Sequence, residues 1–337
     1  MYIYEKMSHT NPKRIFMCTA ISDNLGRHLF GRTLDLECSF GESVAVTPRN
    51  FRLKFLHGGV LKEHFSIIGT AYINDGAPLY YDAANEVGLC AAALNFPGYA
   101  MYQNVKKESF NITSFELIPR VLAEFSTVSE VKDFLNEVNI TNESAKMELP
   151  ATPLHWIFAD RENSLTVEAT ESGLKVYDNP FGVLTNSPDF LYHTANLANY
   201  ASLSPSLQKC NICKEKLTFC SRGLGAFGLP GDFSSASRFV RAVFMKSNAQ
   251  LSEDNCISRF FHIMDSLSVP LGTVITDEGK PVSTVYTSCI DTDDKTYYFT
   301  TYKKRRITSV KLTEALSSGK ELSLFSMTDG EDISERI

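Results

Sequence analysis

The fold is decided by one stretch, in which Met17-Cys18-Thr19-Ala20-Ile21 and Leu29-Phe30-Gly31-Arg32-Thr33-Leu34-Asp35 flank a turn at Asp23-Asn24-Leu25-Gly26. Apolar and β-branched residues on both sides of an Asx/Gly turn predict an antiparallel hairpin. With the turn centred between Asn24 and Leu25, Cys18 pairs with about Gly31, Arg32 lies alongside the thiol and Asp35 lies just past the strand end. The hairpin therefore predicts a thiol, a guanidinium and a carboxylate at one sheet edge.

Cys18 has the neighbours that a nucleophile requires. Cysteine attacks as its thiolate, and a nearby arginine lowers the thiol pKa from about 8.5. If everything before Cys18 is removed, its own α-amine, with a reference pKa of about 7.7 to 8, lies within reach of the sulfur and can act as the base. Asp35 would then hold the amine. A lone cysteine in a strand is usually a small buried apolar residue, but its position and companions here favour catalysis.

Length and composition limit the functional class. The chain has 337 residues, of which 43% are hydrophobic and 21% are charged, and a net charge of -6. These values predict a globular protein of one large domain or two ordinary ones. The negative charge argues against a nucleic-acid partner, so we expect a small-molecule substrate. No apolar run approaches the ~20 residues of a membrane span, residues 1–17 lack the apolar core of a secretory signal, and we expect a cytoplasmic enzyme.

Hydrophobic patterns alternate between strands and helices along the chain. Strands are predicted at 43–48, 66–73, 88–95, 154–159, 164–169, 174–177, 284–289, 296–302 and 307–312. Helical spacing is found at 114–125, 127–138, 236–247 and 252–267, and a capping box at Thr127-Val128-Ser129-Glu130 opens the second of these helices. This order predicts an α+β protein in which helices cover two mainly antiparallel sheets.

Domain organisation follows from the polar segments. Residues 1–17 lack periodicity and are expected to be an extension that is absent or removed, and residues 18–337 are expected to form one domain. If translation starts at Met17, removal of that methionine frees Cys18; if it starts at Met1, the chain must be cut between Met17 and Cys18. Residues 201–231 are rich in Ser, Lys and Gly and predict a long loop that leaves the domain, which we call the excursion and assign to assembly.

Three further residues are candidates for the site. Asn95 and Asn186 each end an apolar run beside a proline turn, and an asparagine amide N–H can stabilise the oxyanion of an acyl-transfer reaction. The alternative is that each asparagine only satisfies its own turn. Arg238 lies in the first turns of a predicted helix, where an arginine is usually exposed or paired with a carboxylate such as Asp232. It can equally direct its charge at a thiolate.

At this point the residues match a family. The sequence resembles the choloylglycine hydrolases, which include bile salt hydrolases and penicillin V acylases, in an ordered set of motifs that runs from Cys18 nearly to the C-terminus: Cys18-Thr19-Ala20-Ile21, Phe30-Gly31-Arg32-Thr33-Leu34-Asp35, Thr47-Pro48-Arg49-Asn50-Phe51, Asn85-Glu86-Val87-Gly88-Leu89, Leu94-Asn95-Phe96-Pro97, Leu154-His155-Trp156, Leu184-Thr185-Asn186-Ser187-Pro188, Leu229-Pro230-Gly231-Asp232-Phe233, Ser237-Arg238-Phe239 and Tyr286-Thr287-Ser288-Cys289. The resemblance implies an N-terminal-nucleophile hydrolase fold, a four-layer αββα sandwich.

The resemblance also implies a role for each candidate. Cys18 matches the N-terminal nucleophile and Asp35 the carboxylate that holds the α-amine. Arg32 and Arg238 match the charges around the thiolate, and Asn186 and Asn95 match the polar groups at the oxyanion and the substrate carbonyl. No cofactor and no metal are implied, and a homotetramer is expected.

The implied substrate is a glycine- or taurine-conjugated bile salt, cleaved at its amide C–N bond. Asn95 favours bile salts, because the penicillin V acylase branch tends to have tyrosine there. Leu34, Phe65 and Ile67 are expected to line an apolar steroid pocket. Two alternatives stay open. One is hydrolysis of penicillin V or other N-acyl amides, including acyl-homoserine lactones; the other is a non-catalytic binding protein, if residues 1–17 are retained.

The sequence departs from the family in two places. Seventeen residues precede Cys18. In an uncut chain Cys18 has no free α-amine, so we do not expect that chain to be active. The excursion also contains Cys210-Asn211-Ile212-Cys213 and Cys220, in a segment that the family uses for tetramer assembly. His193 is the only nearby histidine and its spacing is irregular for zinc, so we expect no metal there.

Overall fold

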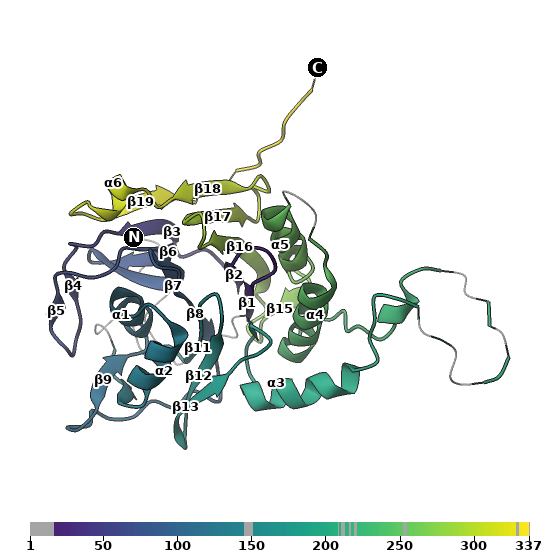
Figure 1. Cartoon of the computed structure of the whole chain (residues 1–337), viewed down its shortest axis with the longest axis horizontal. Helices are drawn as coiled ribbons and strands as arrows, with labels where there is room; N and C mark the ends of the chain where they lie inside the picture. The colour runs from purple at the N-terminus through teal and green to yellow at the C-terminus, as the bar shows by residue number, and fades with distance from the viewer. Residues whose placement is uncertain are drawn as a thin grey trace.

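Two antiparallel sheets form the centre of the molecule (Figure 1). The computed structural model describes residues 17–144, 151–207, 209, 213–215, 217–218, 221–251, 255–327 and 330–336. The seven-stranded sheet has the order β14 (Val183–Leu184), β1 (Met17–Asp23), β2 (Leu29–Leu36), β16 (Pro281–Asp291), β17 (Thr296–Thr301) and β18 (Thr308–Lys311), and β15 (Val274–Ile275) pairs with β16.

The second sheet has eight strands. Their order is β13 (Gly173–Asp178), β12 (Ser164–Thr170), β11 (Leu154–Ala159), β8 (Cys90–Asn95), β7 (Ala77–Asn85), β6 (Ile67–Asn74), β3 (Ser43–Thr47) and β19 (Ser323–Ser326). Two short pairs lie outside these sheets: β4 (Leu53–Lys54) with β5 (Val60–Leu61), and β9 (Phe110–Thr113) with β10 (Val138–Thr141).

Helices cover the outer faces of both sheets. Helices α1 (Leu117–Glu124) and α2 (Val128–Leu135) cover the eight-stranded sheet, whereas α4 (Ser235–Asn248) and α5 (Cys256–Asp265) lie against the seven-stranded sheet (Figure 1). Helices α3 (Phe190–Leu197) and α6 (Glu314–Ser317) are peripheral. The predicted capping box of α2 is confirmed, because the Thr127 and Glu130 side chains exchange hydrogen bonds with the opposite backbone N–H groups.

The core is divided into two clusters by the eight-stranded sheet. One cluster, which contains Cys18, fills the space between the sheets and extends to α4 and α5. The other lies between the eight-stranded sheet and helices α1 and α2. Successive strand residues point to opposite faces, so Ile67 belongs to the second cluster and Ile68 to the first. The αββα sandwich is confirmed.

The register of the β1–β2 hairpin differs from the prediction. Cys18 pairs with Leu34 rather than with Gly31, and Asp23 pairs with Leu29. The turn centres on Gly26, which has a left-handed φ of 83°, and the Asp23 carboxylate accepts the Leu25 N–H at 3.3 Å. Residues 24–28 therefore form a longer loop than expected. Asp35 lies inside β2, and Arg32 remains a diagonal neighbour of Cys18.

Gly31 allows β2 and β16 to approach closely. A Cβ atom at this position would lie 2.0 Å from the backbone oxygen of Ser288. No L-residue with a side chain fits this space without movement of the β16 backbone. The close contact places Ser288 beside Arg32, whose backbone N–H donates to the Ser288 Oγ at 3.1 Å.

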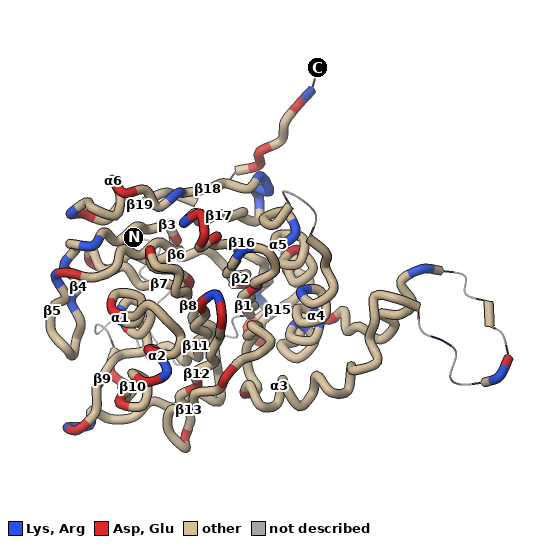
Figure 2. The backbone as a smooth tube through the Cα atoms, viewed as in Figure 1, with Lys and Arg blue, Asp and Glu red and all other residues tan. Residues whose placement is uncertain are grey.

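The excursion projects away from the sandwich between α3 and α4 (Figure 1). In its described part, the helical structure is a short 3-10 turn at Leu224–Ala226. Basic and acidic side chains are interspersed over the sandwich, whereas α3 has none of either (Figure 2). Among the described residues, no helix combines the length and apolarity needed to cross a bilayer.

Candidate active site

Cys18 lies in β1, between the two sheets, and is 2% exposed. Its backbone N–H donates to the Oδ1 of Asn186 at 2.8 Å. Burial raises the pKa of the Cys18 thiol, and Arg32 is the strongest influence that lowers it. The described chain includes Met17, which pairs with Asp35, so the Cys18 nitrogen here belongs to a peptide bond.

Arg32 is fully buried and held by backbone oxygens. Its Nη1 donates to Ala93 O at 2.6 Å and to Tyr81 O at 3.0 Å. Ala93 and Tyr81 belong to the facing sheet, so Arg32 spans the gap between the sheets. Among the described residues no carboxylate contacts Arg32 directly, so its charge lowers the pKa of the nearby Cys18 thiol and favours the thiolate.

Asp35 is a fully buried carboxyl with two hydroxyl donors. Thr284 Oγ1 donates to its Oδ1 at 2.5 Å, and Thr33 Oγ1 donates to its Oδ2 at 3.1 Å. Burial raises the pKa of the Asp35 carboxyl, and Arg238 is the strongest influence that lowers it. The two hydroxyls fix the orientation of the carboxyl next to the start of β1.

Asn186 connects the nucleophile to the other polar residues. Its Oδ1 accepts from the Cys18 N–H and from Arg238 Nη2 at 2.7 Å. Its Nδ2 donates to the backbone oxygen of Asn95 at 2.8 Å. Two donors at one end and an acceptor at the other fix which end of the amide is oxygen. An amide nitrogen carries two hydrogens, so the second can stabilise a developing oxyanion.

Arg238 reaches the same site from the first turns of α4. Its Nη1 donates to Cys18 O and, at 2.7 Å, to Thr19 Oγ1, while its Nε donates to Phe233 O at 3.0 Å. The structure thus contradicts the alternative of an exposed arginine paired with Asp232, since Arg238 is 1% exposed and Asp232 accepts from Ser237 Oγ instead.

Asp82 is a member of the site's surroundings that sequence reasoning missed. This buried carboxyl of β7 accepts from the hydroxyls of Tyr286, Tyr297 and Ser288 at 2.5, 2.7 and 2.9 Å. Burial raises the pKa of Asp82, and Arg32 is the strongest influence that lowers it. An acid inside β7, where the residues before the terminal Asn85 are otherwise apolar or tyrosine, was the available signal.

The structure brings together seven of the nine predicted site residues: Leu34 and the six predicted catalytic residues. Leu34 pairs directly with Cys18 across the hairpin. Contact or electrostatic influence links Cys18, Arg32, Asp35, Asn95, Asn186 and Arg238, as described above.

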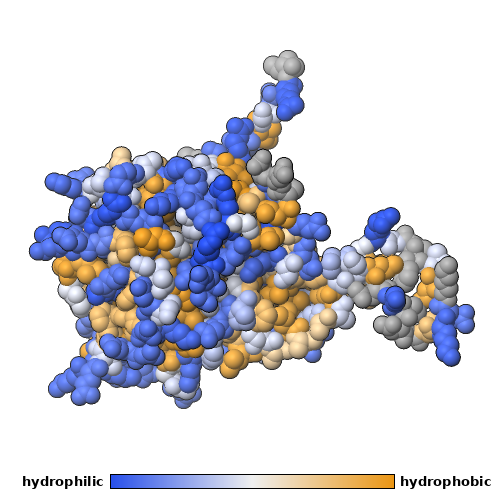
Figure 3. Space-filling view, viewed as in Figure 1, coloured by the Kyte–Doolittle hydropathy of each residue, from blue (hydrophilic) through white to orange (hydrophobic). Residues whose placement is uncertain are grey.

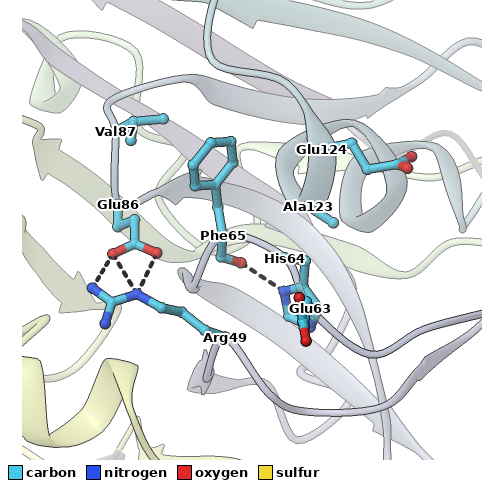
Figure 4. A pocket seen from close by; sticks show the side chains of 8 residues that line it. All are labelled: Arg49, Glu63, His64, Phe65, Glu86, Val87, Ala123 and Glu124. Carbon is cyan, nitrogen blue, oxygen red and sulfur yellow. Dashed lines mark hydrogen bonds and ion pairs between the residues drawn. The ribbon is translucent and has the colours of Figure 1, made fainter.

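Phe65 and Ile67 are placed elsewhere. Ile67 is fully buried in the cluster beneath α1, and Phe65 lines a cavity of about 640 Å³ (Figure 4). The other lining residues of that cavity are Arg49, Glu63, His64, Glu86, Val87, Ala123 and Glu124. Figure 4 shows the Arg49 guanidinium bonded to Glu86 on one wall. The expectation that Phe65 and Ile67 line a pocket with Leu34 is therefore corrected. Successive strand residues point to opposite faces, so Ile68 and not Ile67 packs in the cluster that contains Leu34, and Phe65 lines a separate cavity.

Of the three cysteines of the excursion, the structure describes Cys213 alone. Cys210 and Cys220 lie outside the described residues, and Cys213 is exposed. Within the parts of the chain that the structure describes, no group of three or more His, Cys, Asp or Glu side chains could hold a metal ion.

A buried thiol under the charges of two arginines, with the Asn186 carboxamide oxygen on its backbone nitrogen and the Asp35 carboxyl nearby, lies at the centre of this αββα sandwich. Residues 18–325 match the model of the linear amide C–N hydrolases, choloylglycine hydrolase family. The chain belongs to this family.

Relatives and solved structures agree with this assignment. The chain is 46% identical to a bile salt hydrolase/transferase of Lactiplantibacillus plantarum, over 88% of this chain and 92% of the relative, and 37% identical to one of Clostridium perfringens, over 92% and 96%. The crystal structure of a variant conjugated bile acid hydrolase from Clostridium perfringens matches with a TM-score of 0.88 at 35% identity, covering 95% of this chain and 99% of that one. A penicillin V acylase from Agrobacterium tumefaciens shares the fold, with a TM-score of 0.72 at 22% identity, covering 91% and 90%.

Proposed function

We propose that this protein hydrolyses the amide bond of glycine- or taurine-conjugated bile salts, with Cys18 as an N-terminal nucleophile. The observation that carries the proposal is the Asn186 carboxamide, which contacts the Cys18 nitrogen at 2.8 Å and Arg238 at 2.7 Å. The Asn186 side chain thereby contacts both the nitrogen that would become the α-amine and the Arg238 guanidinium, and its own amide nitrogen is the proposed oxyanion donor. Relatives at 37 to 46% identity that are named bile salt hydrolases support the substrate class.

The reaction follows from the proposed roles. The Cys18 thiolate attacks the substrate carbonyl, and the negative oxygen that develops receives hydrogen bonds from Asn186 Nδ2 and the Asn95 side chain. The α-amine of Cys18 takes the thiol proton and then gives it to the departing nitrogen of glycine or taurine. Water attacks the resulting thioester, releases the bile acid and restores the thiol.

The mechanism requires that Met17 be absent. With Met17 attached, the Cys18 nitrogen is an amide, which cannot take a proton. Burial also raises the pKa of the Cys18 thiol, so a nearby base is needed to form the thiolate. We therefore propose that residues 1–17 are missing from the active protein. If they are retained, a binding function without catalysis becomes the better account.

Glycine release from glycocholate tests the proposal. A chain that begins at Cys18 is expected to release glycine, and Cys18→Ser is expected to lose nearly all of this activity. If the trimmed protein has a reactive Cys18 but releases no glycine or taurine, the proposed function is wrong. Rates on penicillin V and on acyl-homoserine lactones, measured in parallel, decide between bile salts and other N-acyl amides.

We further propose a cytoplasmic homotetramer that is assembled through the excursion and α3. Leu191 and Tyr192 of α3 are 54% and 48% exposed, and Phe227 of the excursion is 85% exposed. Figure 3 shows hydrophobic surface over α3 and on the excursion. Burial of such side chains against other copies removes apolar surface from water.

A further inference from the structure

We propose that His155, held by Glu168, is a positioning residue that sets the orientation of Asn186. This inference rests on the proposed amidase function, in which Asn186 stabilises the oxyanion. It concerns a group that does not contact Cys18 and acts through the backbone that carries Asn186.

His155 holds one end of the peptide group that precedes Asn186. Its Nε2 lies 2.9 Å from the backbone oxygen of Thr185 and donates to it. The N–H of the same peptide group, which belongs to Asn186, donates to Ser235 Oγ at 2.9 Å. A planar peptide held at both its oxygen and its nitrogen cannot rotate. The direction of the Asn186 side chain is therefore fixed through the backbone that carries it.

Glu168 fixes the imidazole in turn. His155 on β11 and Glu168 on β12 are paired across the strands, and Nδ1 lies 3.2 Å from Glu168 Oε1. Both side chains are fully buried. The same Oε1 accepts the Phe190 N–H at 3.0 Å, whereas Oε2 has no hydrogen-bond partner among the described residues. Burying a carboxyl group costs free energy unless the group is hydrogen-bonded. The contacts of the Glu168 carboxyl orient His155 and the start of α3.

The ring face of His155 packs against the residue that follows the second asparagine. The imidazole stacks on Phe96 with ring centroids 4.3 Å apart and an interplanar angle of 9°. Phe96 directly follows Asn95, whose backbone oxygen accepts from Asn186 Nδ2 at 2.8 Å. A flat ring with an N–H at Nε2 is thus required at this position. Phenylalanine supplies the flat ring without the N–H.

His155→Phe in the chain that begins at Cys18 tests the inference. The variant keeps a ring against Phe96 and frees Thr185 O. We expect kcat for glycocholate to fall about 100-fold, as when one oxyanion donor is displaced, with KM changed less than about threefold. The rate at which iodoacetamide alkylates Cys18, followed on its own peptide by mass spectrometry, is expected to stay within about twofold of wild type, because Arg32, the strongest influence that favours the thiolate, stays in place.

A double-mutant cycle separates positioning from general damage. If His155 acts through Asn186, His155→Phe costs less than about threefold in an Asn186→Ala background. The inference would be overturned if the fall in kcat of the double variant equalled the product of the falls in the two single variants. It would also be overturned if kcat for His155→Phe were within about twofold of wild type. His57→Phe is the matched control, since His57 contacts Glu143 in a part-buried pair that includes no site residue; its kcat is expected to be unchanged.

Glu168→Gln serves if His155→Phe fails to fold. It keeps the shape of the side chain, but an amide oxygen that must still accept the Phe190 N–H holds Nδ1 less strongly than the carboxylate oxygen does. We expect kcat to fall at least about fivefold at an unchanged alkylation rate; an unchanged kcat would contradict the inference. An inactive wild-type chain with a reactive Cys18 would instead disprove the proposed function, so the two failures are distinguishable.

Discussion

The Nη2 of Arg238 lies 2.7 Å from the carboxamide oxygen of Asn186. That oxygen also accepts the Cys18 N–H, so the arginine orients the amide whose nitrogen faces the other way. Arg238 thereby touches two parts of the site at once: its charge lowers the pKa of the Cys18 thiol, and its hydrogen bond holds the Asn186 amide, the proposed oxyanion donor.

Arg238→Lys is expected to lower kcat for glycocholate about 100-fold, because an ammonium cannot reproduce the fork that contacts Cys18 O and Asn186 Oδ1. Arg241→Lys is the matched control on the same helix. Arg241 donates to Ser266 O at 2.9 Å and to Pro230 O at 2.7 Å and contacts no site residue, so its kcat is expected to fall less than fivefold. Equal losses in the two variants would show that the activity depends only on the stability of α4.

Asp82→Asn is expected to lower the free energy of unfolding by about 1 to 3 kcal/mol, because an amide nitrogen cannot accept from the hydroxyls that the carboxyl now satisfies. Urea denaturation at pH 7 measures the change. Asp178→Asn, at an exposed carboxylate that pairs with Lys132, is expected to change it by less than about 0.5 kcal/mol. If Asp82→Asn lowers the free energy of unfolding no more than Asp178→Asn does, the hydrogen bonds from the tyrosine hydroxyls to Asp82 do not stabilise the fold.

His28 is expected to make the protein less stable in acid. Burial lowers the pKa of His28 to about 4, so the folded protein keeps this imidazole neutral, while the unfolded chain takes up a proton below about 6.5. Its contribution is complete above pH 6.5 and is lost as the pH falls towards 4. In His28→Gln, the difference between the free energies of unfolding at pH 7 and pH 5 should shrink by about 2 kcal/mol. Identical pH dependences in the variant and the wild type would refute this.

Phe227→Ser is expected to weaken the proposed tetramer, because it removes the most exposed large apolar side chain among the described residues of the excursion. Light scattering after gel filtration should show the wild type at four chains and the variant at fewer. Ile333→Ser is the control, since Ile333 is 75% exposed but lies in the C-terminal segment. A wild-type monomer, or a Phe227→Ser tetramer, would exclude assembly through this surface.

Local sequence patterns predicted the layers well because strand alternation and helix caps are encoded by near neighbours. The β1–β2 hairpin shows the limit. Its strands were found, but the length of the loop depends on Gly26 and on the Asp23 carboxylate, and a shift of the turn centre changes every pairing. Helix α3 was missed although Asp189 caps it through the Tyr192 N–H at 2.8 Å, because its short apolar segment follows a proline.

The site itself was predictable where a motif marked it and hidden where contacts cross the chain. Asn186 and Arg238 were found through their turn and helix positions. Asp82 was not, since its partners Tyr286 and Ser288 are more than 200 residues away in sequence. Neither was the role of His155, which depends on Glu168 in the next strand. Phe65 and Ile67 were assigned from the family resemblance, which does not reveal that Ile67 faces α1 and not the Cys18 cluster.

The first residue of the catalytically active protein tests the central claim most directly. Intact-mass and N-terminal peptide analysis of the fraction that releases glycine from glycocholate should show a chain that begins at Cys18. Full activity in a chain that still carries Met17 would contradict the account, because its Cys18 nitrogen could not take up the thiol proton.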